Sequence, residues 1–388
     1  MTIRTPDNLI IHNFSCLLLR KSYTQWFSLL VILFILFSCS KDPIRETEAP
    51  GNDPPPTSTS YENGIFVINE GNFNWGNASV TFIDDTSNQA EQNIFEKANE
   101  RGLGDVAQSM KIYNDLGLIA VNNSNRIEVV SLKDFKLVKS ITDIPSPRYI
   151  EIVDPSKAYV TSLQKNITVI SLTDFSVQKV IPTPTWTEGL VRYDHFLFVT
   201  SVGKYFEPNS TRKAQVLVID TKNDVIIDSI FTGKEPLGIV IDKKQKIWIL
   251  CTGGYDFYEA PRLIRMDPLL RMVEQIYIFP NSDKIPKRLC INPGGDTLYF
   301  LTDAVYQMPV TASDLPAQPL IESLGRSFYG LAVHPKTGTI YVTDVLDYIQ
   351  NGKVYEFRSS DGTMMNSYDA GRIPGSFCFT PDPARQLK

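Results

Sequence analysis

Seven times along this 388-residue chain, an apolar run with the composition of a strand ends in a polar pair and a turn. Recurrence at a fixed period is the sequence signature of a repeat architecture, so this feature constrains the fold more than any single residue does. The seven polar pairs are Asn69/Glu70, Asn122/Asn123, Thr161/Ser162, Thr200/Ser201, Cys251/Thr252, Thr302/Asp303 and Thr343/Asp344.

Each repeat begins with a second recurring motif, of which PRYIEIVD (147–154) is typical. Successive copies of this motif start roughly 39 to 50 residues apart. This spacing is typical of propeller blades that contain four strands. The runs are rich in Val, Ile, Tyr and Phe, and the turns between them carry Asp, Asn, Gly and Pro. A helical solenoid has a similar period, but within the apolar runs the residue pattern alternates with a period of two, which argues against helices. We therefore predict an all-β chain with four antiparallel strands, A to D, in each repeat.

The two ends of the repeat pattern complement each other. The first repeat, beginning at GIFVINEG (64–71), lacks a strand A. The last copy of the opening motif, PGSFCFTP (374–381), is followed by no strand B, C or D. A C-terminal strand that joins the first blade would complete that blade and remove the open edges. The sequence thus predicts a seven-bladed β-propeller, closed by its C-terminal strand.

In such a ring the B–C and D–A connections share one face, which we call the loop-rich face, and the seven polar pairs lie there too. Four B–C connections are much longer than a hairpin needs: 69–78, 201–215, 252–262 and 344–353. Their aromatic residues are Phe73, Trp75, Tyr205, Phe206, Tyr255, Phe257, Tyr258 and Tyr348. The D–A connections add Gln108, Arg148, Tyr149, Trp186, Glu188, Arg288, Phe328 and Tyr329. Aromatic and amide side chains on long loops favour a binding site on this face.

The N-terminal segment has the pattern of a bacterial lipoprotein. Arg20 and Lys21 precede a short apolar run that ends at Phe37-Ser38-Cys39, which predicts a signal peptide over 1–38 and lipidation of Cys39. The run is short for a membrane-spanning helix. Residues 39–62 are rich in Pro, Ser, Thr and acids, as a flexible tether is, and residues 63–388 form the propeller.

The sequence shows little sign of catalytic chemistry. It has only three histidines, and neither His195 nor His334 belongs to a zinc-like cluster; both are expected to lie in surface turns. The remaining cysteines, Cys251, Cys290 and Cys378, are expected to be small apolar fillers. We expect no enzyme activity, no metal and no catalytic cofactor. A net charge of −5 gives no reason to expect nucleic acid as a partner.

A family resemblance adds a candidate ligand. The segments GIFVINEGNFNWGNASVTFID (64–84), LGDVAQSMKIYND (103–115) and PGSFCFT (374–380) resemble the YncE-like propeller lipoproteins of the BtuG type. The resemblance implies a surface lipoprotein of the outer membrane that binds cobalamin or a related cobamide. It also implies that the ligand passes to a TonB-dependent outer-membrane transporter, and that the lipid anchor is the only contact with the membrane.

By match to the family motifs, the expected ligand-binding residues are Asn69, Glu70, Asn72, Gln108, Asn122, Asn123, Arg148, Tyr149, Trp186, Tyr255, Asp344 and Tyr348. Asn and Gln both donate and accept hydrogen bonds, which suits a ligand that carries many primary amides. Two alternatives stay open. The same face suits a glycan, peptide or protein partner. A propeller enzyme would need a convergent acid pair, for example one drawn from Glu70, Asp303, Asp344 and Asp347, or a metal cage.

Overall fold

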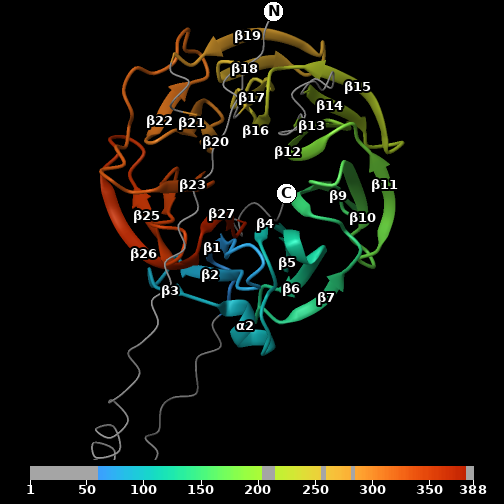
Figure 1. The fold of residues 1–388 in the computed structure, drawn as a ribbon, viewed down its shortest axis with the longest axis vertical. Coiled ribbons are helices and arrows are strands. Elements are labelled where there is room, and N and C mark those ends of the chain that lie inside the picture. Colours follow the sequence, from blue (N-terminus) through green and yellow to red (C-terminus); the bar gives the residue numbers. More distant parts are fainter. Residues whose placement is uncertain (1–59, 203–214, 255–258, 281–284, 382–388) are drawn as a thin grey trace, which may run out of the picture. The chain divides into compact units, whose positions relative to one another are not determined.

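A computed structural model describes residues 60–202, 215–254, 259–280 and 285–381 of the chain. These described residues form seven antiparallel sheets that stand in a ring around a central opening (Figure 1). The prediction of an all-β, seven-bladed propeller is confirmed. The predicted signal peptide, Cys39 and residues 39–59 of the tether lie outside the described residues. Within the described ranges, no helix is long and apolar enough to cross a membrane.

Each blade begins with an inner strand beside the central opening. In blade order, the inner strands are β27 (Pro374–Phe379), β4 (Ala107–Tyr113), β8 (Pro147–Asp154), β12 (Trp186–Tyr193), β16 (Pro236–Ile241), β20 (Lys287–Ile291) and β23 (Phe328–Val333). The second strands are β1 (Gly64–Asn69), β5 (Leu116–Val121), β9 (Lys157–Ser162), β13 (Phe196–Val202), β17 (Ile247–Cys251), β21 (Thr297–Leu301) and β24 (Ile340–Asp344).

The third and outer strands complete the blades. The third strands are β2 (Ser79–Asp84), β6 (Arg126–Ser131), β10 (Asn166–Ser171), β14 (Gln215–Asp220), β18 (Arg262–Asp267), β22 (Val305–Pro309) and β25 (Asn351–Phe357). The outer strands are β3 (Ala90–Glu91), β7 (Leu137–Ile141), β11 (Val177–Pro182), β15 (Val225–Phe231), β19 (Met272–Ile278) and β26 (Met364–Arg372).

The ring closes as the sequence predicts. Strand β27 pairs antiparallel with β1, with Cys378 opposite Phe66. Beyond the strand, the backbone N–H of Gly64 donates to Thr380 Oγ1 at 2.9 Å, and the N–H of Thr380 donates to the Gly64 carbonyl at 3.0 Å. The first blade therefore consists of one C-terminal and three N-terminal strands, which ties the two ends of the ring together.

The hydrophobic core lies between the blades. In the described part of the chain, seven buried clusters each join residues of two neighbouring blades. Within β5, for example, Leu118 packs in the cluster shared with the third blade, and Ile119 packs in the cluster shared with the first. Because both faces of a blade are covered, the second strands are apolar at successive positions. All six residues of β1 are buried.

Two local features differ from the prediction. The sixth blade has three paired strands among its described residues instead of four, and Ile321 forms only an isolated bridge to Val305. Pro316 and Pro319 interrupt the segment where a fourth strand would lie, and a proline cannot donate to a strand ladder. A six-residue helix, α2 (Ile94–Asn99), lies between β3 and β4. This helix is too short to show a period in the sequence.

His334 and the three cysteines can also be compared with expectation. His334 is buried, contrary to the expectation of a surface turn residue, and its Nδ1 accepts the backbone N–H groups of Lys336 and Thr337 at 3.1 and 3.3 Å. Cys251, Cys290 and Cys378 are free thiols in strands. Burial raises the pKa of the Cys251 thiol to about 12, as expected for an apolar filler.

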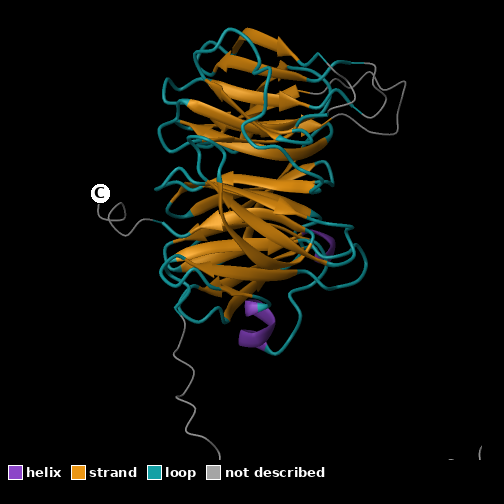
Figure 2. Cartoon of the chain, turned by 90° about the vertical axis from the view of Figure 1, so that its left-hand side faces the viewer, coloured by secondary structure: helices purple, strands orange, loops and turns teal. Residues whose placement is uncertain are grey.

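The strands run between two faces, where the turns lie (Figure 2). The start of each inner strand lies beside the end of the second strand, as the pairing of Pro147 with Ser162 shows. The polar pairs that end the second strands therefore meet at the loop-rich face, where the inner strands begin.

Candidate functional site

Every inner strand carries a one-residue bulge near its first residue. In the third blade, Pro147 pairs with Ser162 and Ile150 pairs with Val160, so one extra residue is inserted in β8. The same register shift recurs in each of the other six blades that the described residues form. A bulge turns side chains out of the regular alternation and is common beside functional sites. The first bulged residues are Gln108, Arg148, Glu188, Leu237, Arg288, Tyr329 and Gly375, which we call the bulge ring.

The threonines of the recurring strand endings stabilise three of these bulges. Thr161 Oγ1 accepts the backbone N–H of Tyr149 at 3.0 Å. Thr343 Oγ1 accepts the N–H of Gly330 at 2.6 Å, and Thr200 Oγ1 donates to the Gly189 carbonyl at 3.2 Å. The Val-Thr motif of these repeats thus satisfies backbone groups that the bulge removes from the ladder.

The bulge ring surrounds a cavity of about 860 Å³ along the central opening. All members of the ring except Gln108 line it, and Gln108 contacts Arg148. The walls contain apolar and aromatic groups, among them Trp186, Tyr149 and Val202, together with charged ones. A cavity of this size with few, convergent polar groups is typical of small-molecule sites.

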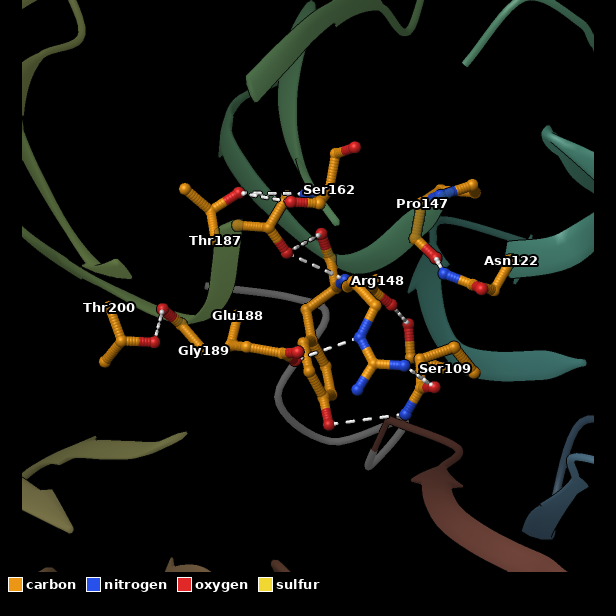
Figure 3. Close-up of polar contacts among 12 residues, drawn as sticks. Ser109, Asn122, Pro147, Arg148, Ser162, Thr187, Glu188, Gly189 and Thr200 are labelled. Carbon is orange, nitrogen blue, oxygen red and sulfur yellow. Dashed lines mark hydrogen bonds and ion pairs between the residues drawn. The ribbon is translucent and has the colours of Figure 1, made fainter. Parts of the chain in front are cut away.

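One side of the ring is held together by Arg148. Its Nε donates to Glu188 Oε2 at 2.9 Å, and its Nη1 donates to Gln108 Oε1. Figure 3 shows the side chains of Arg148 and Glu188 projecting toward each other from neighbouring strands. Burial alone would lower the pKa of Arg148, but the charge of Glu188 raises it above its usual value. Arg148 is therefore a permanent cation in the cavity wall.

The opposite side of the ring is built around Glu70. The hydroxyl of Tyr329 contacts both carboxylate oxygens of Glu70 at 3.1 Å, and Arg288 Nη2 lies 3.9 Å from Glu70 Oε1. A Cβ added to Gly375 would lie only 2.3 Å from Glu70 Oε1. The glycine of the bulge ring thus leaves the space that the Glu70 carboxylate fills.

The pKa of Glu70 predicts a pH effect on stability. Burial raises this pKa above the ordinary value of 4.5, against the lowering charges of Arg288 and Arg148. A raised pKa in the folded protein stabilises the fold fully below about pH 4.5, and this contribution is lost as the pH rises through the folded-state pKa. The free energy of unfolding of wild type relative to Glu70→Gln should therefore fall as the pH rises from 4 to 8. Urea denaturation at a series of pH values measures this difference, and a difference that stays constant contradicts the assignment.

The structure brings five of the predicted ligand-binding residues together at the cavity. Arg148, Tyr149 and Trp186 line it directly. Glu70 and Gln108 contact lining residues through Tyr329 and Arg148. These five side chains come from four blades, and only the closure of the ring brings them together.

Three further predicted residues lie on the outer loops. Asn72 Nδ2 donates to the Tyr348 carbonyl at 2.7 Å, which joins the 69–78 loop to the 344–353 loop. Asn123 Nδ2 donates to Asn74 Oδ1 at 3.0 Å. The ring of Tyr348, 47% exposed, lies edge-on to Tyr329 with centroids 6.1 Å apart. These residues form part of the rim above the cavity.

Three of the other predicted residues, Asn69, Asn122 and Asp344, are absent from the cavity lining. Asn69 is fully buried and donates to Ser79 and Thr81 within the first blade. Asn122 is buried in a short 3-10 turn, η1 (Asn122–Ser124), and donates to the Pro147 carbonyl. Asp344 is buried and accepts the N–H groups of Ser327 and Leu346. The amides of Asn69 and Asn122 thus bond to neighbouring strands, and the carboxylate of Asp344 stabilises the turn that follows β24. Tyr255 lies outside the described residues.

The cavity lining also includes residues that were not in the predicted ligand-binding set, among them Glu188, Leu237, Lys287 and Arg288. Glu188 and Arg288 lie at the same position of the repeat as Gln108 and Arg148, because each is the first bulged residue of its inner strand. Alignment of the seven recurring motifs that form the inner strands would therefore have identified Glu188 and Arg288 as equivalents of Gln108 and Arg148. Lys287 lies one residue earlier, at the pairing position before the bulge, and no signal in the sequence distinguishes it.

Comparison with protein-family models gives one match. Residues 63–377 match a domain of unknown function, DUF5074. A search of curated protein sequences found no match.

Solved structures share the fold at low sequence identity. A quinoprotein alcohol dehydrogenase-like protein from Bacteroides thetaiotaomicron is 16% identical, with a TM-score of 0.63 over 83% of this chain and 79% of that one. A functionally unknown protein from Desulfotomaculum acetoxidans is 14% identical, with a TM-score of 0.57 over 82% and 100%. The dihydro-heme d1 dehydrogenase NirN is 12% identical, with a TM-score of 0.56 over 84% and 77%. At these identities the likeness concerns the fold alone.

Proposed function

We propose that this chain, which belongs to the DUF5074 family, is a binding protein that takes a corrinoid, cobalamin or another cobamide, at the central cavity of its loop-rich face. The observation that carries the proposal is the cavity itself, where the bulge ring sets hydrogen-bonding side chains among aromatic walls. In this proposal the protein performs no chemistry on the ligand.

The chemistry of a corrinoid suits these walls. Its macrocycle is a broad, largely apolar plate bordered by primary amides, which both donate and accept hydrogen bonds. Trp186 and Tyr149 offer flat apolar surface, and Arg148 and Glu188 offer a donor and an acceptor nearby. A corrinoid exceeds the cavity, so we place its outer part against the rim. There the side chains of Phe73 and Trp75 are 64% and 70% exposed.

The sequence patterns extend the proposal to the cell surface. The predicted lipidation of Cys39 would hold the propeller on the outer membrane through the tether 39–62. From that position the protein would pass its ligand to a TonB-dependent transporter, as the family resemblance implies. Both statements rest on the sequence and remain proposals.

A second candidate function is binding of a glycan, peptide or protein partner at the rim. Exposed apolar side chains favour it: besides Phe73 and Trp75, Ile349 of the neighbouring loop is 67% exposed. Large exposed apolar groups on one face often mark an interaction site. Contact between the two loops through Asn72 and Tyr348 makes this rim continuous.

Titration with cyanocobalamin distinguishes the two functions. We expect one corrinoid to bind per chain with a dissociation constant below about 1 μM, as for many specific sites. Trp186→Ala, which removes an apolar wall of the cavity, should weaken binding about tenfold or more. Phe231→Ala, on the outer strand β15, serves as the matched aromatic control and should leave the affinity unchanged. If titration with cyanocobalamin produces no heat of binding and does not shift the melting temperature of the protein, the partner-binding function is favoured.

A further inference from the structure

The cavity contains more cationic than anionic side chains. Lys287, Arg288 and Arg148 line it, whereas the carboxylates around the bulge ring are Glu188 and Glu70. Glu151 also lines the cavity, but Lys111 pairs with it at 2.7 Å. Within the described part of the chain, Lys287 therefore stands in the cavity wall without a carboxylate of its own.

Several donors of these cations are not used by the protein. Within the described ranges, Lys287 Nζ makes no hydrogen bond or ion pair, and it lies 6.0 Å from the centroid of the Tyr329 ring. Arg288 uses Nε to donate to the Tyr329 carbonyl at 3.0 Å, but neither of its terminal nitrogens makes a hydrogen bond to a described residue. Of the Arg148 nitrogens, Nη2 makes none to the described residues.

The backbone of Arg288 and its contact with Tyr329 hold this side chain at the cavity wall. Its φ is +55°, in the left-handed region that non-glycine residues rarely adopt and that costs on the order of 1 kcal/mol. The guanidinium stacks on the Tyr329 ring at 4.8 Å, which fixes it at the cavity wall. Strain of this kind is retained where the surroundings hold a side chain in one position.

We propose that Lys287 and Arg288 form a subsite for a phosphate group of the bound molecule, with Arg148 as a third cation in the same cavity. The proposal rests on the proposed function for the identity of the whole ligand. A cobamide suits it, because such a ligand carries one phosphodiester beside its amides.

A phosphate fits this donor set better than a carboxylate does. One guanidinium satisfies both oxygens of a carboxylate, whereas a tetrahedral phosphate offers additional oxygens to separate donors. Here an ammonium and a guanidinium stand at adjacent positions of β20, and the second guanidinium stands on β8. Burial, and then the charge of Arg288, lowers the pKa of Lys287, so an anion beside it would also relieve that repulsion.

The test compares three probes on the full chain: inorganic phosphate, cyanocobalamin, and dicyanocobinamide, which lacks the phosphodiester. Lys287→Met should bind inorganic phosphate and cyanocobalamin about tenfold more weakly than wild type, because a charge-assisted hydrogen bond is lost. The affinity for dicyanocobinamide should not change. Lys243→Met is the matched control, since Lys243 is an exposed lysine that pairs with Asp296 at 2.8 Å.

Acetate titrated in parallel should bind more weakly than phosphate, and the melting temperature of Lys287→Met should remain that of wild type because no ion pair is removed. Equal phosphate affinity in wild type and Lys287→Met overturns the subsite, as does an equal loss for both corrinoids. If neither corrinoid binds wild type, the proposed function fails. The phosphate titration then still decides whether the subsite exists.

Discussion

Replacing Arg148 by methionine is expected to lower the free energy of unfolding by about 3 kcal/mol, the cost of breaking a buried ion pair. The substitution would leave the buried side chains of Glu188 and Gln108 without their partner. The side chain of Glu188 is only 8% exposed, and Arg148 Nε is its ion-pair partner at 2.9 Å. Gln108, which is 2% exposed, loses the donor to its Oε1. Corrinoid affinity should fall at least tenfold in the same variant, because a wall of the cavity changes charge.

A double-mutant cycle tests the origin of this loss. Arg148→Met together with Glu188→Met removes both charges, so the double variant should be more stable than Arg148→Met alone. Lys243→Met breaks an exposed pair with Asp296, and should change the free energy of unfolding by less than about 1 kcal/mol. Urea denaturation of wild type, Arg148→Met, Glu188→Met, the double variant and Lys243→Met supplies the values. A loss below about 1 kcal/mol in Arg148→Met would show that water replaces the ion pair.

The second large effect is expected at the closure of the ring, in Gly64→Ala. A Cβ on Gly64 would lie 2.2 Å from the Ile83 carbonyl oxygen and 2.6 Å from the Phe82 ring. The carbonyl belongs to the neighbouring strand β2 and Phe82 is buried, so neither can move away without separating strands. We expect a loss of about 3 kcal/mol, at the upper end of the range for overpacked cores.

Gly102→Ala is the matched control for this substitution. The nearest atom to a Cβ at Gly102 is the Gly76 carbonyl oxygen at 3.7 Å, which is an ordinary contact. Thermal and urea unfolding of the two variants should differ clearly, with Gly102→Ala close to wild type. Equal stability of both variants would mean that β1 and β2 adjust at the closure without loss of packing.

Much of the fold could be predicted from the sequence because its determinants are local. The polar pair after each apolar run marks the end of a second strand, and the missing first and last strands indicate closure by β27. The exceptions are also local. Pro316 and Pro319 lie where the fourth strand of the sixth blade was expected, and α2 is shorter than any detectable period.

The candidate site was predicted only in part. Gln108, Arg148 and Tyr149 were expected at the loop-rich face and lie at the cavity or beside it. Asn69 and Asn122 have the same polar character, yet the amide of Asn69 bonds within the first blade and that of Asn122 bonds to the Pro147 carbonyl of the next blade. Composition cannot separate these two groups, because an amide that stabilises a turn and an amide that meets a ligand look alike in a sequence.

The sequence by itself determined the repeat, the strands, the number of blades, the closure and the face on which the long loops lie. Only the tertiary structure decided which polar residues point into the central cavity. The physical reason is the register of each inner strand against its partner, since a one-residue bulge changes which way Arg148, Glu188 and Arg288 project. That register is set by pairing between strands, and the ring then joins residues of different blades into one site.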